Sequence, residues 1–548
     1  MARGTSRSAP VDWVTRAADD AVRHAGEGRL VTVASGASPS GPIHLGNLRE
    51  FLTPHFVAEE LRRRGVAVRH LHSWDDYDRF RKVPAGVPAS WSEHIGRPLS
   101  AVPDPWRCHA SWAEHFKEPL RESLRELGVE MEEISQTQMY TAGAYREQIL
   151  LAVRRRDEIE QVLARHRTKA PAAASAESDE EAAALADSVA DDDESSGSGD
   201  LARFPFRPWC AECGRDTTAV TSYDDETTVL AYACESDGHV GTTDLTHEDG
   251  GKLVWKVDWP MRWAFEQVDF EPAGLDHMTP GSSYTVGQEL VGTIFDWRAP
   301  TRVTYAFVGF AGMQKMSSSS GGVPTAADAL RVLEAPILRW LYVRRQPKQA
   351  FTVDFGPEVV RLYDEWDALG RKAADPAKHD LAVLAWERAS STAVAGALPT
   401  SPVVVPFRTL SSVADVTAGS ADLISTVIGE VGFAHDSVED LQPRLGKAMA
   451  WTAEFVPDAD RTIVRETPDQ DRLAALSEDE ERWLRIFLDR LPTSMDLDEV
   501  TSVVYGTPKV ARGLGFDDPP TDQVKADQRD FFRLLYGLLV GKDRGPRL

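Results

Sequence analysis

Residues 30–71 carry the pattern that most restricts the fold of this chain. Residues 30–34 (LVTVA) are a β-branched run typical of a buried parallel strand, and a Gly/Ser/Pro turn (SGASPSGP) follows them. Residues 43–64 place leucine and phenylalanine four positions apart, which predicts a helix that ends at Gly65. Residues 66–71 (VAVRHL) are predicted to form the next strand. Strand, turn, helix and strand make a βαβ unit, whose ligand-binding edge lies at the first turn.

The remaining pattern divides the chain into an α/β part, residues 1–330, and a helical part, residues 331–548. Within the first part, residues 142–167 are predicted to form one long helix. Residues 252–263 (KLVWKVDWPMRW) and 301–310 (TRVTYAFVGF) are predicted to be strands.

Residues 169–200 have a different composition, because they are rich in Ala, Ser, Asp and Glu and contain no aromatic residue. Such a segment buries too little apolar surface to offset the entropy lost on ordering, so disorder is predicted.

The formal net charge of −25 argues against a surface that is coated all over by nucleic acid. Residues 171–200 hold ten acidic residues and no Lys or Arg, so the rest of the chain carries about −15. A local basic face can still bind RNA, because distant charge is screened. No apolar run is long enough to cross a bilayer and the first residues are polar, so a cytoplasmic protein without membrane contact is predicted.

The turn after the first strand, ASPSGPIHLGN at residues 37–47, has the features of a phosphate site. Gly41 and Gly46 allow close approach of backbone and nucleotide. The free N–H groups and the positive dipole of a helix start suit an anion. His44 adds a side-chain donor, and Asn47 lies about one helical turn later.

A second candidate phosphate site is KMSSSSGG at residues 315–322. A lysine followed by four hydroxyls and two glycines is typical of a loop that closes a cation over a polyphosphate. Taken alone, His44 is more often a structural histidine and a Ser/Gly run is more often a linker. As a pair, the two segments are far more specific than either one alone.

Three of the four cysteines cluster within residues 204–246, while Cys108 stands alone. The spacing Cys-x-x-Cys is that of a zinc knuckle, and a closed tetrahedral zinc site would be structural. A pair of free thiols in a former metal site is the competing interpretation. The candidate ligands are Cys210, Cys213, Cys234 and His239, with Asp237 as the alternative fourth ligand.

The two phosphate signatures resemble the paired signatures of class I aminoacyl-tRNA synthetases. The wider pattern is similar to the archaeal-type lysyl-tRNA synthetases of that class, which also occur in some bacteria. The matching segments cover roughly residues 30–330 in order, and they are ASGASPSGPIHLGNLRE, SWDDYDRFRKVP, KVDWPMRW, GLDHMTPGSSY and KMSSSSG. The C-terminal third is consistent with that family but is weaker evidence.

The resemblance implies a Rossmann-like catalytic domain, residues 1–330, with the zinc-knuckle-like insertion at 204–246, followed by an all-α anticodon-binding domain, residues 331–548. It implies activation of L-lysine by ATP with Mg²⁺ and transfer of the lysyl group to the terminal ribose of tRNA(Lys). A structural Zn²⁺ is expected in the insertion, and a monomer is favoured over an oligomer.

The resemblance also implies the site residues. Catalytic roles fall on His44, Asn47 and Lys315. The ATP site comprises Pro39, Gly41, His44, Gly46, Asn47, Gly274, Asp276, Lys315, Met316, Ser317 and Ser318. The lysine site comprises Gly36, Ser38, Trp255, His277 and Tyr305, with Trp259 as the alternative to Trp255. Aromatic faces attract an ammonium group by about 0.5–2 kcal/mol, and Asp75, Asp76 and Asp276 are the carboxylates considered for the amino groups.

The second signature departs from the family pattern at one point. Related loops carry a second lysine within or just after the serines, where this chain has Ser318, Ser319 and Ser320. Either Arg302 or Lys82 compensates, or activity is lower, or it is lost. One alternative is therefore a catalytically impaired tRNA-binding paralogue. A separate alternative is a class I synthetase for another amino acid, such as glutamate, on the same scaffold.

Overall fold

The computed structural model describes residues 10–167, 201, 203–278, 281–313, 322–493 and 496–543 of the chain. The chain folds as two compact units, residues 1–354 with 365–398 and residues 355–364 with 399–548. The first unit extends beyond the boundary predicted at residue 330, because helices α10 and α11 pack against α3 and α2 of the α/β part. Residues 169–200, predicted to be disordered, lie outside the described residues.

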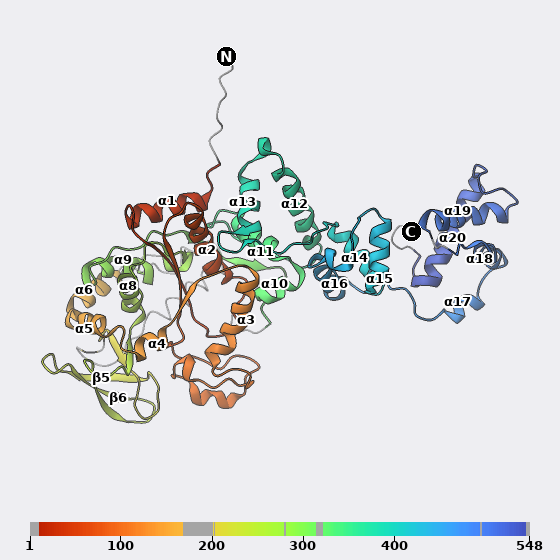
Figure 1. Cartoon of the computed structure of the whole chain (residues 1–548). Helices are drawn as coiled ribbons and strands as arrows, with labels where there is room; N and C mark the ends of the chain where they lie inside the picture. The colour runs from red at the N-terminus through yellow and green to blue at the C-terminus, as the bar shows by residue number, and fades with distance from the viewer. Residues whose placement is uncertain are drawn as a thin grey trace, which may run out of the picture. The chain divides into compact units, whose positions relative to one another are not determined.

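A parallel sheet forms the centre of the first unit, as the βαβ pattern predicts. Its strands lie in the order β1 (Val31–Ala37), β2 (Val68–Trp74) and β3 (Glu132–Ser135). Phe270 forms parallel bridges with both Val33 and Thr301, which extends the sheet on the other side of β1. Helices α1 (Trp13–Ala25) and α2 (Leu48–Arg63) pack against β1 (Figure 1).

Helix α2 begins later than predicted and ends as predicted. It starts at Leu48 because residues 38–47 form the phosphate-site turn rather than a first helical turn. Gly65 follows the helix with a φ of 73°, a left-handed conformation that costs glycine no steric penalty.

The first unit contains further helices, some of which line the cavity described below. The helices are α3 (Trp112–Glu126), α4 (Gln136–Thr141), α5 (Arg146–Arg154), α6 (Arg156–Arg167), α8 (Trp255–Phe265), α9 (Ser283–Ile294), α10 (Ala326–Val332), α11 (Ala335–Val343) and α13 (Leu381–Ser390); α12 (Glu358–Ala373) begins in the second unit. Short 3₁₀ turns are η1 (Ala89–His94), η2 (Leu99–Ala101), η5 (Leu275–Met278) and η6 (Pro376–Lys378). The predicted helix at 142–167 is interrupted at Arg155 and forms α5 and α6.

The strand predicted for residues 252–263 is mostly a helix. Only β8 (Gly251–Leu253) is extended, and α8 begins at Trp255. Trp255, Trp259 and Trp263 stand four positions apart, a spacing that puts them on one helical face. Their individual preference for strands misled the prediction, since tertiary packing overrides such propensities.

The strand predicted for residues 301–310 is two short strands, because the chain changes partner within it. β10 (Thr304–Tyr305) pairs with β9 (Ala273–Gly274), and β11 (Val308–Phe310) pairs with β12 (Phe351–Val353).

The cysteine-containing segment folds as a small β-rich module within the first unit. β5 (Thr218–Tyr223), β6 (Val229–Cys234) and β7 (Val240–Asp244) form an antiparallel sheet, and β4 (Phe206–Pro208) pairs with β8. The module packs its apolar side chains, including Tyr232 and Leu230, into one core with those of α5 and α6. It is the yellow sheet below α5 in Figure 1.

The second unit is helical, as predicted, and its described residues contain no strand. Beyond the start of α12, its helices are α14 (Phe407–Val416), α15 (Ala421–Glu430), α16 (Arg444–Phe455), α17 (Gln470–Ala474), α18 (Glu478–Arg490), α19 (Leu497–Ala511) and α20 (Asp522–Val540), with the 3₁₀ turn η7 (Val438–Leu441). Across the described part of the chain, every helix is too short or too polar to cross a membrane.

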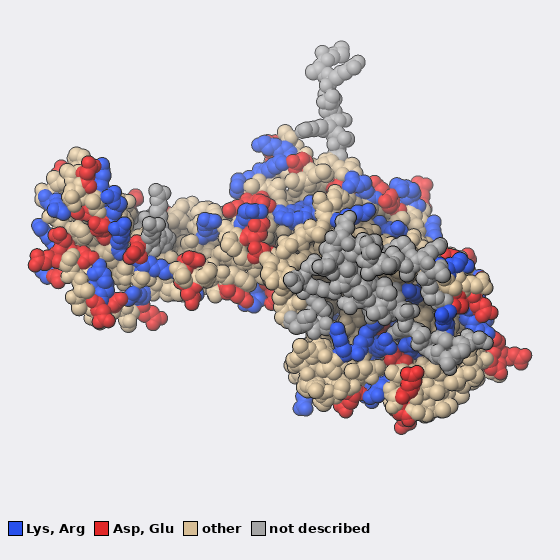
Figure 2. Space-filling model, turned by 180° about the vertical axis from the view of Figure 1, so that it is seen from behind, with Lys and Arg blue, Asp and Glu red and all other residues tan. Residues whose placement is uncertain are grey.

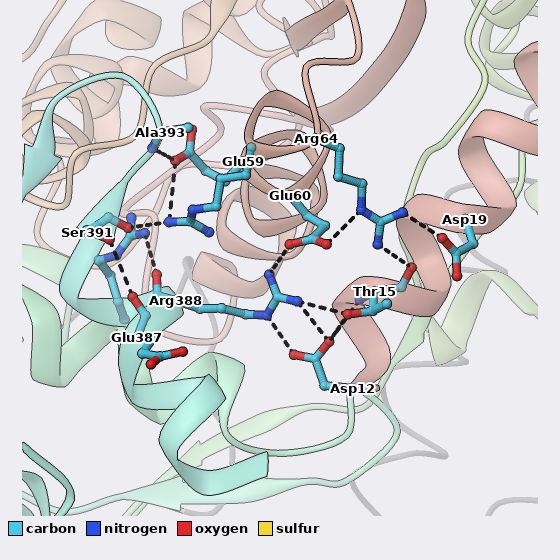
Figure 3. A network of polar contacts seen from close by, with 12 residues as sticks. Asp12, Thr15, Asp19, Glu59, Glu60, Arg64, Glu387, Arg388, Ser391 and Ala393 are labelled. Carbon is cyan, nitrogen blue, oxygen red and sulfur yellow. Dashed lines mark hydrogen bonds and ion pairs between the residues drawn. The ribbon is translucent and has the colours of Figure 1, made fainter. Parts of the chain in front are cut away.

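A polar network anchors the C-terminal half of α2 to neighbouring helices (Figure 3). Arg388 of α13 is almost fully buried and donates to Asp12 Oδ2 at 2.7 Å and to Glu60 Oε2 at 2.6 Å. Arg64 then joins Glu60 to Asp19 of α1. The network ties the C-terminal half of α2 to α1 and α13, and so holds the helix whose first residues reach the site described next.

The face of the molecule shown in Figure 2 carries charges of both signs. On the face shown in Figure 2, Lys and Arg side chains are interspersed with Asp and Glu. Contact with an anionic partner therefore depends on local groups rather than on a uniformly basic face.

Candidate active site

A cavity of about 810 Å³ opens in the first unit where the parallel strands β1 and β2 end. Its wall is formed by the end of β1, the following turn, the first turn of α2, helix α8 and the strands β9 to β12. The carboxyl edge of a parallel sheet is where Rossmann-like folds bind ligands, and the volume is that of a small-molecule site.

His44 lies on the cavity wall in the turn before α2. Its Nδ1 accepts the backbone N–H of Gly46 at 3.0 Å, and Asn47 Oδ1 accepts the backbone N–H of His44 at 3.2 Å. Because Nδ1 is an acceptor, the proton of the neutral ring resides on Nε2. Burial lowers the pKa of His44 to about 4. The ring is therefore a neutral hydrogen-bond donor at pH 7, beside the N–H groups of a helix start.

The residues on either side of the second signature lie at the same place. His44 and Thr325 form an antiparallel bridge, and the Leu45 N–H donates to Pro324 O at 2.9 Å. Met313, on the other side of the signature, lines the cavity. Lys315, Met316, Ser317 and Ser318 themselves lie outside the described residues. The fold thus brings the two flanks of the second signature to the first.

The other predicted ATP residues divide into two groups. Gly46, Asn47 and Gly274 line the cavity, whereas Pro39 and Gly41 are buried beside it and do not. Asp276 lies in η5, and its side chain is outside the described part of the structure.

All five residues predicted for the lysine site line the cavity, and they are Gly36, Ser38, Trp255, His277 and Tyr305. Trp259 lines it as well. The rings of Trp255 and Trp259 stack with centroids 5.3 Å apart, and His277 meets Trp259 edge-on at 5.5 Å. Both candidate tryptophans, Trp255 and Trp259, therefore contribute to the cavity wall as a stacked pair.

Glu50 of α2 lies among these residues and was not predicted from the sequence. Its Oε1 accepts the Gly36 N–H at 3.2 Å, and its Oε2 accepts the Tyr305 hydroxyl. Two predicted residues therefore orient one carboxylate on the cavity wall. The available signal was position: Glu50 follows Asn47 by three residues, on the same face of the helix start.

The predicted acidic residues after β2 have separate roles. Asp75 lines the cavity and pairs with Arg262 at 2.5 Å; burial raises its pKa to about 6 although Arg262 opposes the shift. Asp76 does not line the cavity. Its carboxylate is instead held by Lys117 at 2.6 Å and by the Thr137 backbone N–H at 2.8 Å.

The cysteine cluster has the donor geometry of a zinc site, and its fourth candidate ligand is Asp237 instead of His239. Sγ of Cys213 and Sγ of Cys234 are 3.7 Å apart, close to the roughly 3.8 Å that two thiolates adopt on a tetrahedral zinc ion. Asp237 Oδ2 lies 3.6 Å from Cys210 Sγ. The four ligand atoms that come within 4.8 Å of one another belong to Cys210, Cys213, Cys234 and Asp237.

His239, which was predicted as the fourth ligand with Asp237 as the alternative, is not part of this group. The turn between β6 and β7 explains the difference: Asp237 Oδ1 accepts the His239 backbone N–H at 2.9 Å, which holds the Asp237 carboxylate beside the thiols.

A second cluster of possible metal ligands lies around Cys108, for which the sequence predicted no metal site. It comprises Asp104, Cys108, His109 and His115, whose ligand atoms also lie within 4.8 Å of one another. Nδ1 of His109 and of His115 lie 3.1 and 3.2 Å from Cys108 Sγ. The spacing Asp-x₃-Cys-His-x₅-His was the signal, but it matches no common zinc motif.

Comparison with known proteins places this geometry in a family. The family described as "tRNA synthetases class I (K)" matches residues 11–391. A curated protein named lysine–tRNA ligase from Streptomyces coelicolor is 52% identical over 555 residues, which cover 98% of this chain and 95% of that protein. A protein of the same name from Thermococcus kodakarensis is 34% identical, with 98% and 96% covered.

A solved glutamate tRNA ligase from Elizabethkingia meningosepticum superposes with a TM-score of 0.42 at 12% identity, covering 94% of each chain, and this likeness carries no argument. The match to the family spans more than half of the chain, and the two relatives span nearly all of it. The chain belongs to the class I (K) tRNA synthetases.

Proposed function

We propose that this protein is a lysine–tRNA ligase that activates L-lysine with ATP and transfers it to the terminal ribose of tRNA(Lys). The observation that carries the proposal is the cavity whose wall includes the Glu50 carboxylate, a stacked tryptophan pair and the His44 turn. The names of the full-length relatives support the same activity.

The first step needs no general base, because the carboxylate of lysine is already a nucleophile at pH 7. One of its oxygens forms a bond to the α-phosphorus of ATP, and the bond from that phosphorus to the bridging oxygen breaks, releasing pyrophosphate. Catalysis then depends on positioning and on stabilising the charge that builds on the phosphates. Mg²⁺ accompanies the triphosphate and neutralises part of that charge.

The residues of the His44 turn are suited to the phosphates. The neutral His44 ring donates from Nε2, and the start of α2 supplies backbone N–H groups and a positive dipole. The family resemblance assigns Lys315, two residues after Met313 in the sequence, as the cation for the phosphates. In the second step a hydroxyl of the terminal tRNA ribose attacks the lysyl carbonyl, and AMP leaves.

The cavity offers partners for a cationic side chain. Glu50 and Asp75 both line it, and a tryptophan face attracts an ammonium group by cation–π contact. Basic residues line it as well, and they are Arg79, Arg81, Arg207, Lys252 and Arg262. Arg262 is engaged by Asp75 and Asp258, and Lys252 by Asp78. The glutamate alternative is opposed by the names of the full-length relatives, which are lysine–tRNA ligases.

The alternative of a catalytically impaired paralogue rests on one observation. The second signature has one lysine, where related loops carry two. Neither compensating cation considered above lines the cavity: Arg302 lies 4.8 Å over the Tyr284 ring, and Lys82 is exposed. The intact His44 turn and the Glu50 pocket favour an active enzyme.

The test of the proposal is amino-acid-dependent exchange of pyrophosphate into ATP, measured with each of the twenty amino acids, with and without tRNA. Lysine should be the one amino acid that supports exchange. Exchange with glutamate instead would reassign the substrate. Binding of tRNA(Lys) with no exchange for any amino acid would establish the paralogue.

The proposed structural metal is zinc, held by Cys210, Cys213, Cys234 and Asp237, with the Asp104 cluster as a second site. We expect two zinc ions per purified chain. Asp237→Ala should remove one of them or weaken its binding by roughly 100-fold, because a closed site needs four donors. His239→Ala is the matched control and should retain both ions. Elemental analysis decides: loss of zinc from His239→Ala but not from Asp237→Ala would restore the ligand set predicted from the sequence.

A further inference from the structure

Glu271 is a buried carboxylate that accepts hydrogen bonds from two tryptophans. Its side chain lines the cavity, although the residue is only 6% exposed. Oε1 accepts the indole N–H of Trp259 at 3.1 Å, and Oε2 accepts that of Trp263 at 2.5 Å. The Glu271 backbone N–H donates to Thr301 O at 3.0 Å, which fixes the residue to the edge of the central sheet.

The two indoles connect this carboxylate to the proposed lysine pocket. Trp259 stacks against Trp255 at an interplanar angle of 18° and contacts His277 edge-on. Trp263 packs behind Trp259, with ring centroids 5.1 Å apart. A change in the direction of the Trp259 indole N–H therefore rotates a ring against which both Trp255 and His277 rest.

Two acceptors are needed at this position. An indole N–H is a donor only, and a buried donor left without an acceptor is costly. An ionised carboxylate provides one oxygen for each indole. A glutamine amide has one oxygen, and its NH₂ group would oppose the second indole N–H.

We propose that Glu271 is a positioning residue for the amino-acid pocket, where its two carboxylate oxygens hold the Trp259 and Trp263 indoles and thereby set the angle of the stacked wall that meets the lysine side chain. This role rests on the proposed lysine–tRNA ligase activity. Glu271 does not take part in the chemical step, since both of its oxygens are engaged by indoles.

The surroundings of Glu271 give the proposal a pH dependence. Burial raises the pKa of Glu271 to about 7, although the two indole hydrogen bonds and Arg262 oppose the shift. The charged groups that interact with Glu271 are Asp75 after β2 and Arg262 of α8. Tyr284 of α9 lies beside the Trp263 ring. As the pH falls through 7, protonation turns one acceptor oxygen into a hydroxyl and weakens one indole hydrogen bond. The KM for lysine should therefore rise on the acid side of this pKa.

The experiment compares Glu271→Gln with wild-type enzyme in the full-length chain. Lysine-dependent exchange at pH 8 should show a KM for lysine raised by about tenfold, as for one lost hydrogen bond to a charged group, with kcat and the KM for ATP changed by less than about threefold. Between pH 6 and 8.5, the wild-type dependence of the lysine KM with a midpoint near 7 should be absent in the variant.

Glu133→Gln is the matched control, because Glu133 also accepts an indole N–H, from Trp74 at 2.7 Å, and neither residue lines the cavity. It should leave the lysine KM and its pH dependence unchanged. An unchanged lysine KM in Glu271→Gln overturns the proposal. A fall in kcat at constant KM also overturns it and assigns the carboxylate to the chemistry.

A readout without substrate separates this inference from the proposed function. The near-ultraviolet circular dichroism of tryptophan in wild-type protein should change with a midpoint near pH 7. The change should be retained in Glu133→Gln and lost in Glu271→Gln. The wild-type titration needs no variant to fold, and a flat wild-type signal between pH 6 and 8.5 contradicts the inference even if lysine exchange is observed.

Discussion

Replacing His44 by alanine should slow lysine-dependent exchange by roughly 10²–10³-fold in kcat, the usual effect of removing one donor that stabilises transition-state charge. The KM for lysine should change little, because His44 belongs to the phosphate end of the cavity. The reason is the fixed tautomer: the Gly46 N–H occupies Nδ1, so the donor is Nε2–H. Steady-state exchange with lysine and ATP varied separately measures both effects.

The matched control for this variant is His379→Ala, since His379 pairs with Glu387 and does not line the cavity. It should leave the exchange rate unchanged. The low pKa of His44, about 4, adds a second expectation. The ring stays neutral from pH 6 upward, so protonation of His44 causes no loss of rate in that range. A His44→Ala enzyme within threefold of wild type would remove this residue from the mechanism.

Replacing Glu50 by glutamine should raise the KM for lysine by roughly 10²–10³-fold, because the substrate ammonium then loses its charged partner in the cavity wall. The Gly36 N–H and the Tyr305 hydroxyl hold this carboxylate in place, and a glutamine keeps its shape while removing its charge. Exchange kinetics at saturating ATP measure the change.

L-norleucine provides the control on the substrate side, because it has the length of lysine without the ammonium group. As a competitive inhibitor, it should bind wild-type and Glu50→Gln enzyme with affinities within a few-fold of each other. An equal loss of affinity for norleucine and lysine would mean that the variant damages the pocket rather than the ammonium contact.

The sequence was sufficient where structure depends on short-range pattern. A run of β-branched residues, a glycine-rich turn and a four-residue apolar repeat predicted the β1–α2–β2 unit, and the structure confirms it. The same logic failed at α8. Its three tryptophans recur every four residues, as on a helical face, but aromatic residues also favour strands, and the helix is set by packing of these rings in the core and on the cavity wall.

The site residues that the sequence missed are identified by partners that only the fold brings to them. In the sequence Glu50 is an ordinary charged residue of a helix, and only the fold brings the Tyr305 hydroxyl to it. Asp237 and His239 are equally good ligands by spacing, and only the turn after β6 separates them. Glu271 gave no signal, because its importance comes from two indoles of α8.

The most direct measurement is a crystal structure of the full-length protein with a non-hydrolysable sulfamoyl analogue of lysyl-adenylate. The account predicts the lysine ammonium about 3 Å from the Glu50 carboxylate, against the Trp255–Trp259 pair, with the nucleotide between the His44 turn and Lys315. An analogue bound with its side chain away from Glu50, or with its nucleotide outside the space between His44 and Lys315, would contradict it.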